Sequence, residues 1–465
     1  MKFAFYTLGC KVNQYETESV REAWTARGGS ECSDPSGADI ILVNSCAITS
    51  RGERDARNAL VRLRREAPEA ILILTGCAAR LVASFVPRKH APVPSADLII
   101  VPEHKDLLTD PDYIGKLLDA AGRLRGKQES RNDALREIEG SALPGPMPRP
   151  SPGTRAYPKL EIRGYRRVRP VLKVEDGCTH RCTYCIVPFT RGRQKSRDAG
   201  AILDECRALI DNGAKEITLL GQNVNSYGLD KHASGDTSFA RLLRKVSELP
   251  GLARLRFVTP HPKDLSPEVI AMFGEVPNLC PRLHLPLQAG SDRVLARMNR
   301  KYDMARYMTL VEGLRAARPD IALSTDLIVG FPGETEEQFQ ETLDAVRAVN
   351  FMSSFSFCYS DRPGTAASRH TDKVEPAEKL RRLERLQALQ EDLSSDWLKA
   401  RVGCKTDILL EGASRKQDGE DAATESWQGR DPWGDAVNVS LPAGIGKAGL
   451  IVPVTIVTAK KHSLI

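Results

Sequence analysis

Short apolar runs alternate with amphipathic stretches along the first third of the chain. The apolar runs cover residues 3–8, 39–44, 70–75 and 97–101. Helical periodicity fills two of the gaps, at about 14–27 and 50–65. Strands separated by helices typically form a parallel sheet that is covered on both faces. The pattern therefore predicts an N-terminal parallel α/β sheet domain over residues 1–123.

A proline-rich stretch interrupts this rhythm. Residues 140–158 hold six prolines among Gly and Ser. Dense proline stiffens a chain and prevents regular packing, so we expect a linker over 124–165.

The middle of the chain repeats the strand–helix alternation. Apolar strands are expected at 170–174, 216–220, 255–259, 283–287, 322–329 and 352–359, with helical stretches between them. Six such units predict a partial (βα)6 barrel over residues 166–398, rather than a closed eight-stranded barrel. A long helix over 375–400 ends this part.

The last part of the chain changes to short strands. They are expected at 406–411, 436–440 and 450–457, separated by Gly and Pro. This pattern predicts a small β-barrel over 399–465, of the kind that binds oligonucleotides.

Composition narrows the class of protein. The 465 residues suit about three domains, and 41% hydrophobic with 27% charged residues is typical of a globular chain. No apolar run approaches a membrane span, and the first residues lack the apolar core of an export signal. We therefore expect a cytoplasmic protein without a membrane anchor. A net charge of +7 permits a nucleic-acid partner.

Eleven cysteines in a chain of this kind favour metal or catalytic use over disulfides. Cys178, Cys182 and Cys185 form a C-x3-C-x2-C segment directly after the strand expected at 170–174. Three thiolates without a nearby fourth can hold a [4Fe–4S] cluster and leave one iron open for a small molecule. The alternative is a plain zinc loop.

This segment resembles the motif of the radical S-adenosylmethionine (SAM) superfamily. The resemblance implies that the open iron binds SAM and that Tyr184 lies beside its adenine. Gly330 and Gly333 belong to a strand-and-turn segment similar to the one that supports the SAM adenine, and Gln288 and Ser291 could hydrogen-bond SAM. The alternatives are packing for Tyr184, a tight turn for the glycines and helix capping for Ser291.

Three further cysteines lie at strand ends. Cys10, Cys46 and Cys77 each follow a predicted strand, and the carboxyl ends of parallel strands meet at one edge of a sheet. Glycine precedes Cys10 and Cys77, which suits a sharp turn with room for a bulky inorganic group. The pattern predicts a second cluster. A buried structural role is the alternative, and it accounts for the cysteines outside both sets. Those are Cys32, Cys206, Cys280, Cys358 and Cys404.

Basic residues gather in three bands that could hold phosphates. One band lies on the helix expected at 50–65, and its alternative is a solvated helix face. The other two flank the central cysteines. Before them lie Arg163, Arg166, Arg167 and Arg169, and after them lie Arg191, Arg193, Lys195 and Arg197.

Two three-cysteine sites on successive α/β domains, followed by a β tail, resemble the radical SAM methylthiotransferase family, which includes the tRNA 2-methylthioadenosine synthases. Nearly the whole chain shares the resemblance, and the tail from about residue 399 is similar to a TRAM domain, an RNA-binding barrel. The family-like segments are 7–16, 44–49, 75–79, 219–225, 284–292 and 328–334.

The resemblance implies a radical SAM enzyme that replaces a C–H hydrogen with a methylthio group. Two [4Fe–4S] clusters and SAM would carry the chemistry, with no catalytic side chain of the protein itself. Cys178, Cys182 and Cys185 would hold the radical-generating cluster, and Cys10, Cys46 and Cys77 an auxiliary cluster that carries the sulfur. The implied partners of a monomeric enzyme are the tRNA anticodon stem-loop and a flavodoxin-like or ferredoxin-like electron donor.

Two substrates fit the segments. Residues 10–14 are similar to the branch that acts on N6-threonylcarbamoyladenosine at tRNA position 37, which we favour slightly. Residues 221–225, 260–264 and 355–364 are more similar to the branch that acts on N6-isopentenyladenosine. A ribosomal-protein aspartate is less favoured, because that branch usually has proline where this chain has Lys11. A methyltransferase without sulfur transfer and a non-catalytic Fe–S RNA-binding protein are the remaining alternatives.

Overall fold

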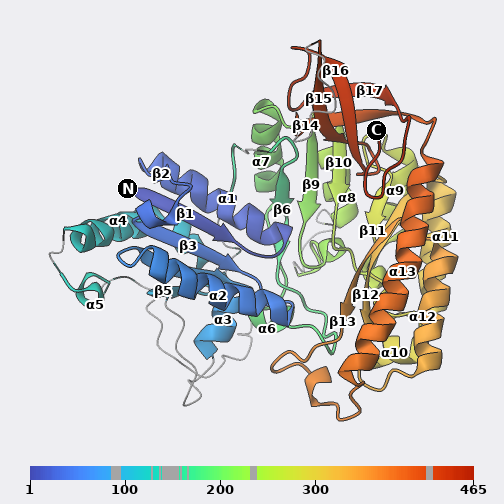
Figure 1. Ribbon diagram of the computed structural model, residues 1–465, viewed down its shortest axis with the longest axis horizontal. Coiled ribbons are helices and arrows are strands. Elements are labelled where there is room, and N and C mark those ends of the chain that lie inside the picture. The colour runs from blue at the N-terminus through green and yellow to red at the C-terminus, as the bar shows by residue number, and fades with distance from the viewer. Residues whose placement is uncertain are drawn as a thin grey trace. The chain divides into compact units, whose positions relative to one another are not determined.

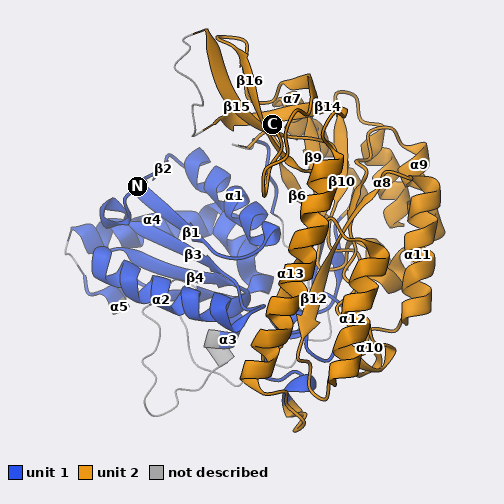
Figure 2. Ribbon diagram, turned by 45° about the vertical axis from the view of Figure 1, so that its right-hand side comes forward, with its two compact units in different colours: residues 1–164, 175–197, 362–368 blue, residues 165–174, 198–361, 369–465 orange. Residues whose placement is uncertain are grey.

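Helices and strands alternate through most of the chain in the computed structural model (Figure 1). The structure describes residues 1–84, 96–126, 129–135, 138, 157, 160–164, 167–230, 238–414 and 423–465. The predicted linker over 124–165, with its prolines, falls largely outside the described residues. Two compact units divide the chain (Figure 2): Met1–Gly164 with Glu175–Arg197 and Arg362–Ser368, and the remainder.

The first unit is built on a five-stranded parallel sheet of order β2-β1-β3-β4-β5. The four predicted strands are present, and the short β2 was not predicted. The strands are β1 (Lys2–Thr7), β2 (Ser30–Glu31), β3 (Ile40–Ser45), β4 (Ile71–Gly76) and β5 (Leu98–Ile100).

Helices cover both faces of this sheet. Side chains alternate between the two faces along each strand, so Leu42 and Ile73 pack with Trp24 while Val43 and Leu72 pack with Leu60. The helices are α1 (Lys11–Ala26), α2 (Ser50–Glu66), α3 (Cys77–Ser84), α4 (Pro111–Arg125) and α5 (Arg131–Ala134). The prediction of a parallel α/β sheet domain is therefore confirmed.

Two other segments complete the first unit. Residues 175–197 form a loop closed by the antiparallel pair β7 (Glu175–Asp176) and β8 (Lys195–Ser196), with the short helix α6 (Val187–Thr190) between them. Ala367, in the segment 362–368, donates its backbone N–H to the Thr183 carbonyl at 2.9 Å, which ties this segment to the loop.

The second unit contains six parallel strands in two groups of three, β10-β9-β6 and β11-β12-β13. A single parallel bridge between Leu255 and Leu279 joins the groups, so the strands form the expected partial barrel. The strands are β6 (Val171–Lys173), β9 (Glu216–Leu220), β10 (Arg254–Phe257), β11 (Arg282–His284), β12 (Ala322–Val329) and β13 (Ser353–Cys358).

Helices follow the barrel strands (Figure 1). Helix α12 (Glu336–Val349) begins with a capping box, in which the side chains of Thr335 and Gln338 each accept a hydrogen bond from the other residue's backbone N–H. The helices are α7 (Ala199–Asp211), α8 (Phe239–Ser247), α9 (Pro267–Glu275), α10 (Asp292–Arg297), α11 (Met304–Ala317), α12 (Glu336–Val349) and α13 (Pro376–Ala400).

The tail of the second unit is a curled antiparallel sheet of order β16-β15-β14-β17. Its strands are β14 (Lys405–Ala413), β15 (Thr424–Arg430), β16 (Ala436–Pro442) and β17 (Ile451–Thr455). Strand β15 was not predicted, because Trp427 is its only large apolar residue. The tail is thus the predicted small β domain, in the form of a half-barrel.

Arginines of the barrel hold the tail through its backbone. Arg254 donates to the carbonyls of Asp407 and Arg430, at 2.7 and 2.8 Å, and Arg256 donates to the Asp431 carbonyl at 3.1 Å. Arg282 donates to the Trp433 carbonyl at 3.1 Å. Buried charge-assisted hydrogen bonds of this kind are strong and directional, so the tail is fixed to the barrel.

The buried carboxyl of Asp431 gives this junction a pH dependence. Burial, and then the charge of Asp435, raises the pKa of Asp431 to about 6. Because the folded pKa lies above the unfolded value of about 3.9, the stability that this group contributes is complete below about pH 4 and is lost as the pH rises through 6.

The free energy of unfolding of an Asp431→Asn variant, measured relative to wild type, should therefore rise by about 3 kcal/mol when the pH is raised from 4 to 8. Hydrogen exchange of the β14–β16 amides at both pH values measures this difference. The matched control is Asp407→Asn, whose side chain is exposed. A stability difference that stays constant with pH would contradict the assignment.

Among the residues that the structure describes, none of the helices combines the length and the apolarity that a membrane crossing requires.

Candidate metal centres

Cys10, Cys46 and Cys77 lie at the carboxyl ends of three neighbouring strands. They follow β1, β3 and β4, which are adjacent in the sheet. Cys10 is the residue before α1, and Cys77 is the first residue of α3. The first turn of a helix presents free N–H groups and the positive end of its dipole, which favours thiolates. The structure thus brings together the three cysteines that the sequence placed at one sheet edge.

Two glycines permit this close approach. Gly9 has a φ of +98°, and a Cβ there would lie 2.5 Å from the Cys46 Cβ and 3.0 Å from its Sγ. Gly76 has a φ of +90°, and a Cβ there would lie 2.2 Å from the Ser45 carbonyl oxygen. Both positions need a backbone conformation that L side chains rarely adopt, so glycine is required.

The thiols are close enough to affect each other's ionisation. Burial raises the pKa of Cys46 to about 12, and the nearby Cys77 and Cys10 add to the rise. Burial also raises the pKa of Cys10, against the opposing effect of Arg191. The raised pKa values favour the protonated thiols. A bound cation or cluster would instead favour the thiolates, because metal binding requires that form.

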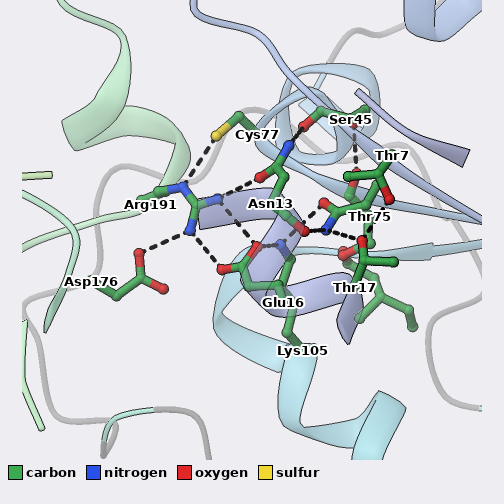
Figure 3. Close-up of polar contacts among 12 residues, drawn as sticks. Thr7, Asn13, Glu16, Thr17, Ser45, Thr75, Cys77, Lys105, Asp176 and Arg191 are labelled. Atoms are coloured by element: carbon green, nitrogen blue, oxygen red, sulfur yellow. Dashed lines mark hydrogen bonds and ion pairs between the residues drawn. The ribbon is translucent and has the colours of Figure 1, made fainter. Parts of the chain in front are cut away.

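A buried polar network surrounds this edge of the sheet (Figure 3). Asn13, in the first turn of α1, donates to the carbonyls of Leu8 and Ser45 at 2.7 and 3.0 Å. Glu16, one helical turn later, forms ion pairs with Lys105 and Arg191. Asn13, Glu16 and Lys105 are almost fully buried, which requires that their polar groups be paired.

Arg191 is the centre of this network (Figure 3). Its Nε donates to the Cys77 Sγ at 3.2 Å, and its Nη1 donates to Glu16 and Asp176 at 2.8 and 3.0 Å. Its Nη2 donates to the Asn13 Oδ1 at 2.9 Å. Burial alone would lower the pKa of Arg191, but the negative groups around it raise the pKa overall. The guanidinium therefore stays charged beside Cys77.

Cys178, Cys182 and Cys185 lie in the loop between β7 and α6, and all three are half-buried. The Cys178 N–H donates to the Gly192 carbonyl and the Cys185 N–H to the Cys182 carbonyl, each at 3.1 Å. Gly177, with a φ of +79°, lets the loop pass the Arg193 carbonyl, 2.3 Å from where a Cβ would stand. Short backbone bonds thus fold three thiols into one loop.

The cysteine loop and the N-terminal sheet edge contribute to one hydrophobic cluster. Ile186, next to Cys185, packs in one cluster with Ala47, Cys77 and Ala78. The loop is therefore supported by the same N-terminal sheet that carries Cys10, Cys46 and Cys77.

The predicted SAM contacts divide between the two units. Tyr184 is half-buried in the loop of the first unit. The other four predicted contacts belong to the second unit and are Gln288, Ser291, Gly330 and Gly333. Gln288 has a left-handed φ of +77° and pairs with β12 through Asp326 and Ile328, and Gly330 follows the end of β12. Ser291 precedes α10 but makes no side-chain capping bond, so the helix-capping alternative is not supported.

Close contacts with neighbouring side chains also explain why residues 330 and 333 are glycines. A Cβ at Gly330 would lie 2.4 Å from the Lys379 Cγ, and a Cβ at Gly333 would lie 2.3 Å from the Asp372 Oδ2. The Gly330 N–H donates to the Glu334 carboxylate at 2.6 Å. The tight-turn alternative therefore fits both positions as well.

Sequence reasoning missed Asn13, Glu16 and Lys105, and it gave Arg191 a different role. Asn13 and Glu16 follow Cys10 at helical spacing, which was a usable signal. Arg191 was placed in a phosphate-binding band, but it is buried, and so is Arg197, which donates to the Tyr15 hydroxyl at 3.1 Å. That hypothesis is wrong for these two arginines.

The arginine band on α2 is largely paired within the protein. Arg57 pairs with Glu53 at 3.1 Å, and Arg62 pairs with Glu66 at 3.6 Å. Most of the band is exposed, as a solvated helix face would be.

Known proteins resemble the chain in both parts. The Radical SAM superfamily matches residues 172–346, and a family described as "Uncharacterized protein family UPF0004" matches residues 2–93. A tRNA-2-methylthio-N(6)-dimethylallyladenosine synthase from Nitratidesulfovibrio vulgaris (Hildenborough) is 47% identical over 100% of this chain and 97% of its own length. The protein of the same name from Lawsonia intracellularis is 43% identical over 100% of this chain and 98% of its own length.

Solved structures share the fold. The radical SAM methyltransferase TsrM from Kitasatospora setae, with tryptophan and a SAM analogue bound, aligns with a TM-score of 0.52 at 15% identity. The alignment covers 90% of this chain and 79% of that one.

A partial parallel barrel with a three-cysteine loop after its first strand is the architecture of a radical SAM protein. The cysteines of the N-terminal sheet and the near full-length identity to its relatives narrow this further. The chain belongs to the radical SAM methylthiotransferase family. It is an enzyme that uses SAM and two [4Fe–4S] clusters, as the sequence predicted.

The residues present fit clusters of this kind. The sheet edge at Cys10, Cys46 and Cys77 offers thiols beside a space that a Cβ at Gly9 would fill. The Arg191 guanidinium, which donates to the Cys77 Sγ, offsets the charge of thiolate ligands. The loop of Cys178, Cys182 and Cys185 offers three thiols within eight residues.

Proposed function

We propose that this chain adds a methylthio group to C2 of N6-isopentenyladenosine, also called N6-dimethylallyladenosine, at position 37 of tRNA. Identity of 43–47% over the whole chain to relatives named for that product carries the proposal. The slight preference for N6-threonylcarbamoyladenosine rested on residues 10–14 alone, and these relatives do not support it. The alternative substrate that the sequence left open is therefore the one proposed.

We assign the cluster ligands by their position in the fold. Cys178, Cys182 and Cys185 hold the radical-generating cluster. The auxiliary cluster belongs to the triad Cys10, Cys46 and Cys77. Tyr184, Gln288, Ser291, Gly330 and Gly333 are the proposed SAM contacts.

When bound, the clusters and SAM supply the one-electron chemistry and the sulfur that replacement of an aromatic C–H hydrogen requires. The side chains hold this machinery in place. Arg191 binds the Cys77 sulfur and the carboxylates of Glu16 and Asp176, and thus fixes the end of the cysteine loop against the sheet. Asn13 donates hydrogen bonds to the carbonyls of Leu8 and Ser45, and thus holds the turn after β1 beside the end of β3.

The partners follow from the proposed substrate. The tail is proposed to bind the tRNA anticodon stem-loop, as a small β domain of a basic protein can. A flavodoxin-like or ferredoxin-like protein would supply electrons to a monomeric enzyme. Oxygen-sensitive clusters favour a reducing cytoplasm as its location.

Nucleoside mass spectrometry of tRNA tests the proposed substrate. A strain that lacks the gene should lose 2-methylthio-N6-isopentenyladenosine and accumulate N6-isopentenyladenosine, and expression of the chain should reverse both changes. Loss of 2-methylthio-N6-threonylcarbamoyladenosine instead would assign the other tRNA branch. An unchanged nucleoside profile would exclude both and would favour the ribosomal-protein substrate.

A further inference from the structure

A mixed aromatic and polar face runs along β11, β12 and β13. Side chains of β12 alternate between the two sides of the sheet, and Leu323, Leu327 and Val329 lie on one side and are buried. Helix α13 packs against β12 and β13. The opposite side, here called the inner face, is more open. It consists of His284, Asp326, Ile328, Phe355 and Phe357.

Strand register places these residues side by side. Asp326 lies opposite Phe355, and Ile328 lies opposite Phe357, in the parallel pairing of β12 with β13. His284 lies opposite Ser324, two residues before Asp326 on the same side of β12. Cross-strand neighbours of this kind form one continuous surface.

The two phenylalanines are unusually accessible for strand residues. Phe355 is 58% exposed and Phe357 is 41% exposed. Large aromatic side chains are normally buried, and clustered exposed aromatics typically mark a binding surface. Among the described residues, the two rings thus keep an apolar surface that is open to a stacking partner.

A histidine–carboxylate pair borders the aromatic part. The His284 Nε2 lies 3.3 Å from the Asp326 Oδ2, and the His284 Nδ1 lies 3.1 Å from the Ser324 Oγ. The Phe355 ring meets the His284 ring edge-to-face, with centroids 5.9 Å apart. The Asp326 side chain keeps 34% of its surface exposed, so its carboxylate can accept a further hydrogen bond.

We propose that the inner face docks the modified purine of the substrate, with Phe355 and Phe357 against the base and its apolar N6 substituent. Asp326 accepts the hydrogen bond of the remaining N6–H donor. The inference rests on the proposed function and names the residues that select the substrate. Proteins that read single RNA bases commonly stack them on aromatic side chains and bind their edges with polar groups.

Charge on the inner face selects between the two candidate nucleosides. The dimethylallyl group is uncharged and apolar, so contact with Phe355 and Phe357 removes apolar surface from water. A threonylcarbamoyl group carries a carboxylate, which Asp326 would repel. Arg282 lies two residues before His284 on β11, and its guanidinium is bound to the Trp433 carbonyl at 3.1 Å.

Fluorescence anisotropy with the anaerobically reconstituted full-length enzyme tests this docking. Three anticodon stem-loops serve as probes, with adenosine, N6-dimethylallyladenosine or N6-threonylcarbamoyladenosine at position 37. Wild type should bind the dimethylallyl loop about tenfold more tightly than the adenosine loop. Phe355→Ala and Phe357→Ala should each reduce that preference about fivefold. Because the rings also contact the base, both variants should weaken binding of the adenosine loop as well, but less than binding of the dimethylallyl loop.

Matched variants control for folding and for charge. Leu380→Ala removes a side chain on α13 that is 55% exposed and should leave the preference unchanged. Phe357→Leu keeps an apolar contact and should retain most of the preference. Asp326→Asn should weaken the discrimination against the threonylcarbamoyl loop by about threefold or more.

The outcomes separate this proposal from the proposed function. An unchanged preference in both phenylalanine variants would overturn the docking face alone, provided that wild type methylthiolates the dimethylallyl loop. If wild type neither prefers nor methylthiolates that loop, the proposed substrate is wrong and the docking proposal fails with it.

Discussion

Replacement of Cys46 by alanine is expected to abolish methylthiolation while SAM cleavage continues. Cys46 lies at the sheet edge with Cys10 and Cys77, and the cysteines of the 175–197 loop form a separate set. Loss of one of three thiolates should prevent that edge from holding its cluster, whereas the loop keeps all three of its own. The methylthiolated product should fall at least about 100-fold.

Two readouts measure this result on the reconstituted enzyme. Liquid chromatography with mass spectrometry quantifies 5′-deoxyadenosine and methylthiolated RNA in the same reaction, and iron analysis should give about half of the wild-type content. Cys182→Ala should lose both products, because it removes a ligand of the loop. Cys404 lies outside both sets and is exposed, so the buried role expected for it from the sequence is wrong. Cys404→Ala should resemble wild type. Continued methylthiolation by Cys46→Ala would contradict the two-cluster assignment.

Replacement of Arg191 by methionine should destabilise the first unit by about 3–5 kcal/mol, because it leaves buried carboxylates without their partner. Asp176 and Glu16 would each lose their ion pair with Arg191, while the ion pair of Glu16 with Lys105 would remain. For a unit of this size the expected fall in melting temperature is on the order of 10 °C. Cys77 would also lose its hydrogen-bond donor, which should lower the reduction potential of a cluster bound there.

Anaerobic thermal unfolding and protein-film voltammetry measure these two effects. Arg191→Lys keeps the charge but lacks the planar set of donors, so it should be intermediate in stability. Arg193→Met, two residues away and exposed, should change stability by less than about 0.5 kcal/mol. Equal melting temperatures for the two methionine variants would refute the role assigned to Arg191.

The sequence predicted the cysteine edge because apolar strands ended at Cys10, Cys46 and Cys77 in register. It did not predict the polar network behind that edge. Lys105 lies in a charged segment, 102–109, that resembles solvated surface, and only the fold brings it to Glu16. Long-range ion pairs of this kind leave no local pattern in a sequence.

Strand β15 and the substrate are two further points that patterns in the sequence alone did not resolve. Strand β15 is polar because the curled tail sheet leaves most of its side chains partly exposed, so hydrophobic patterning did not reveal it. Short motifs also conflicted about the substrate, since residues 10–14 and 221–225 favour different branches. Similarity over the full length, rather than any single segment, favours the isopentenyladenosine branch.

The junction between barrel and tail has an evolutionary consequence. Arg254, Arg256 and Arg282 all bind backbone carbonyls of the tail, and every amino acid provides a carbonyl. Substitutions on the tail can therefore accumulate without loss of its attachment, provided that the path of its backbone is kept. Selection is thus free to change the exposed side chains of the tail, while the three barrel arginines keep the tail attached at the same place.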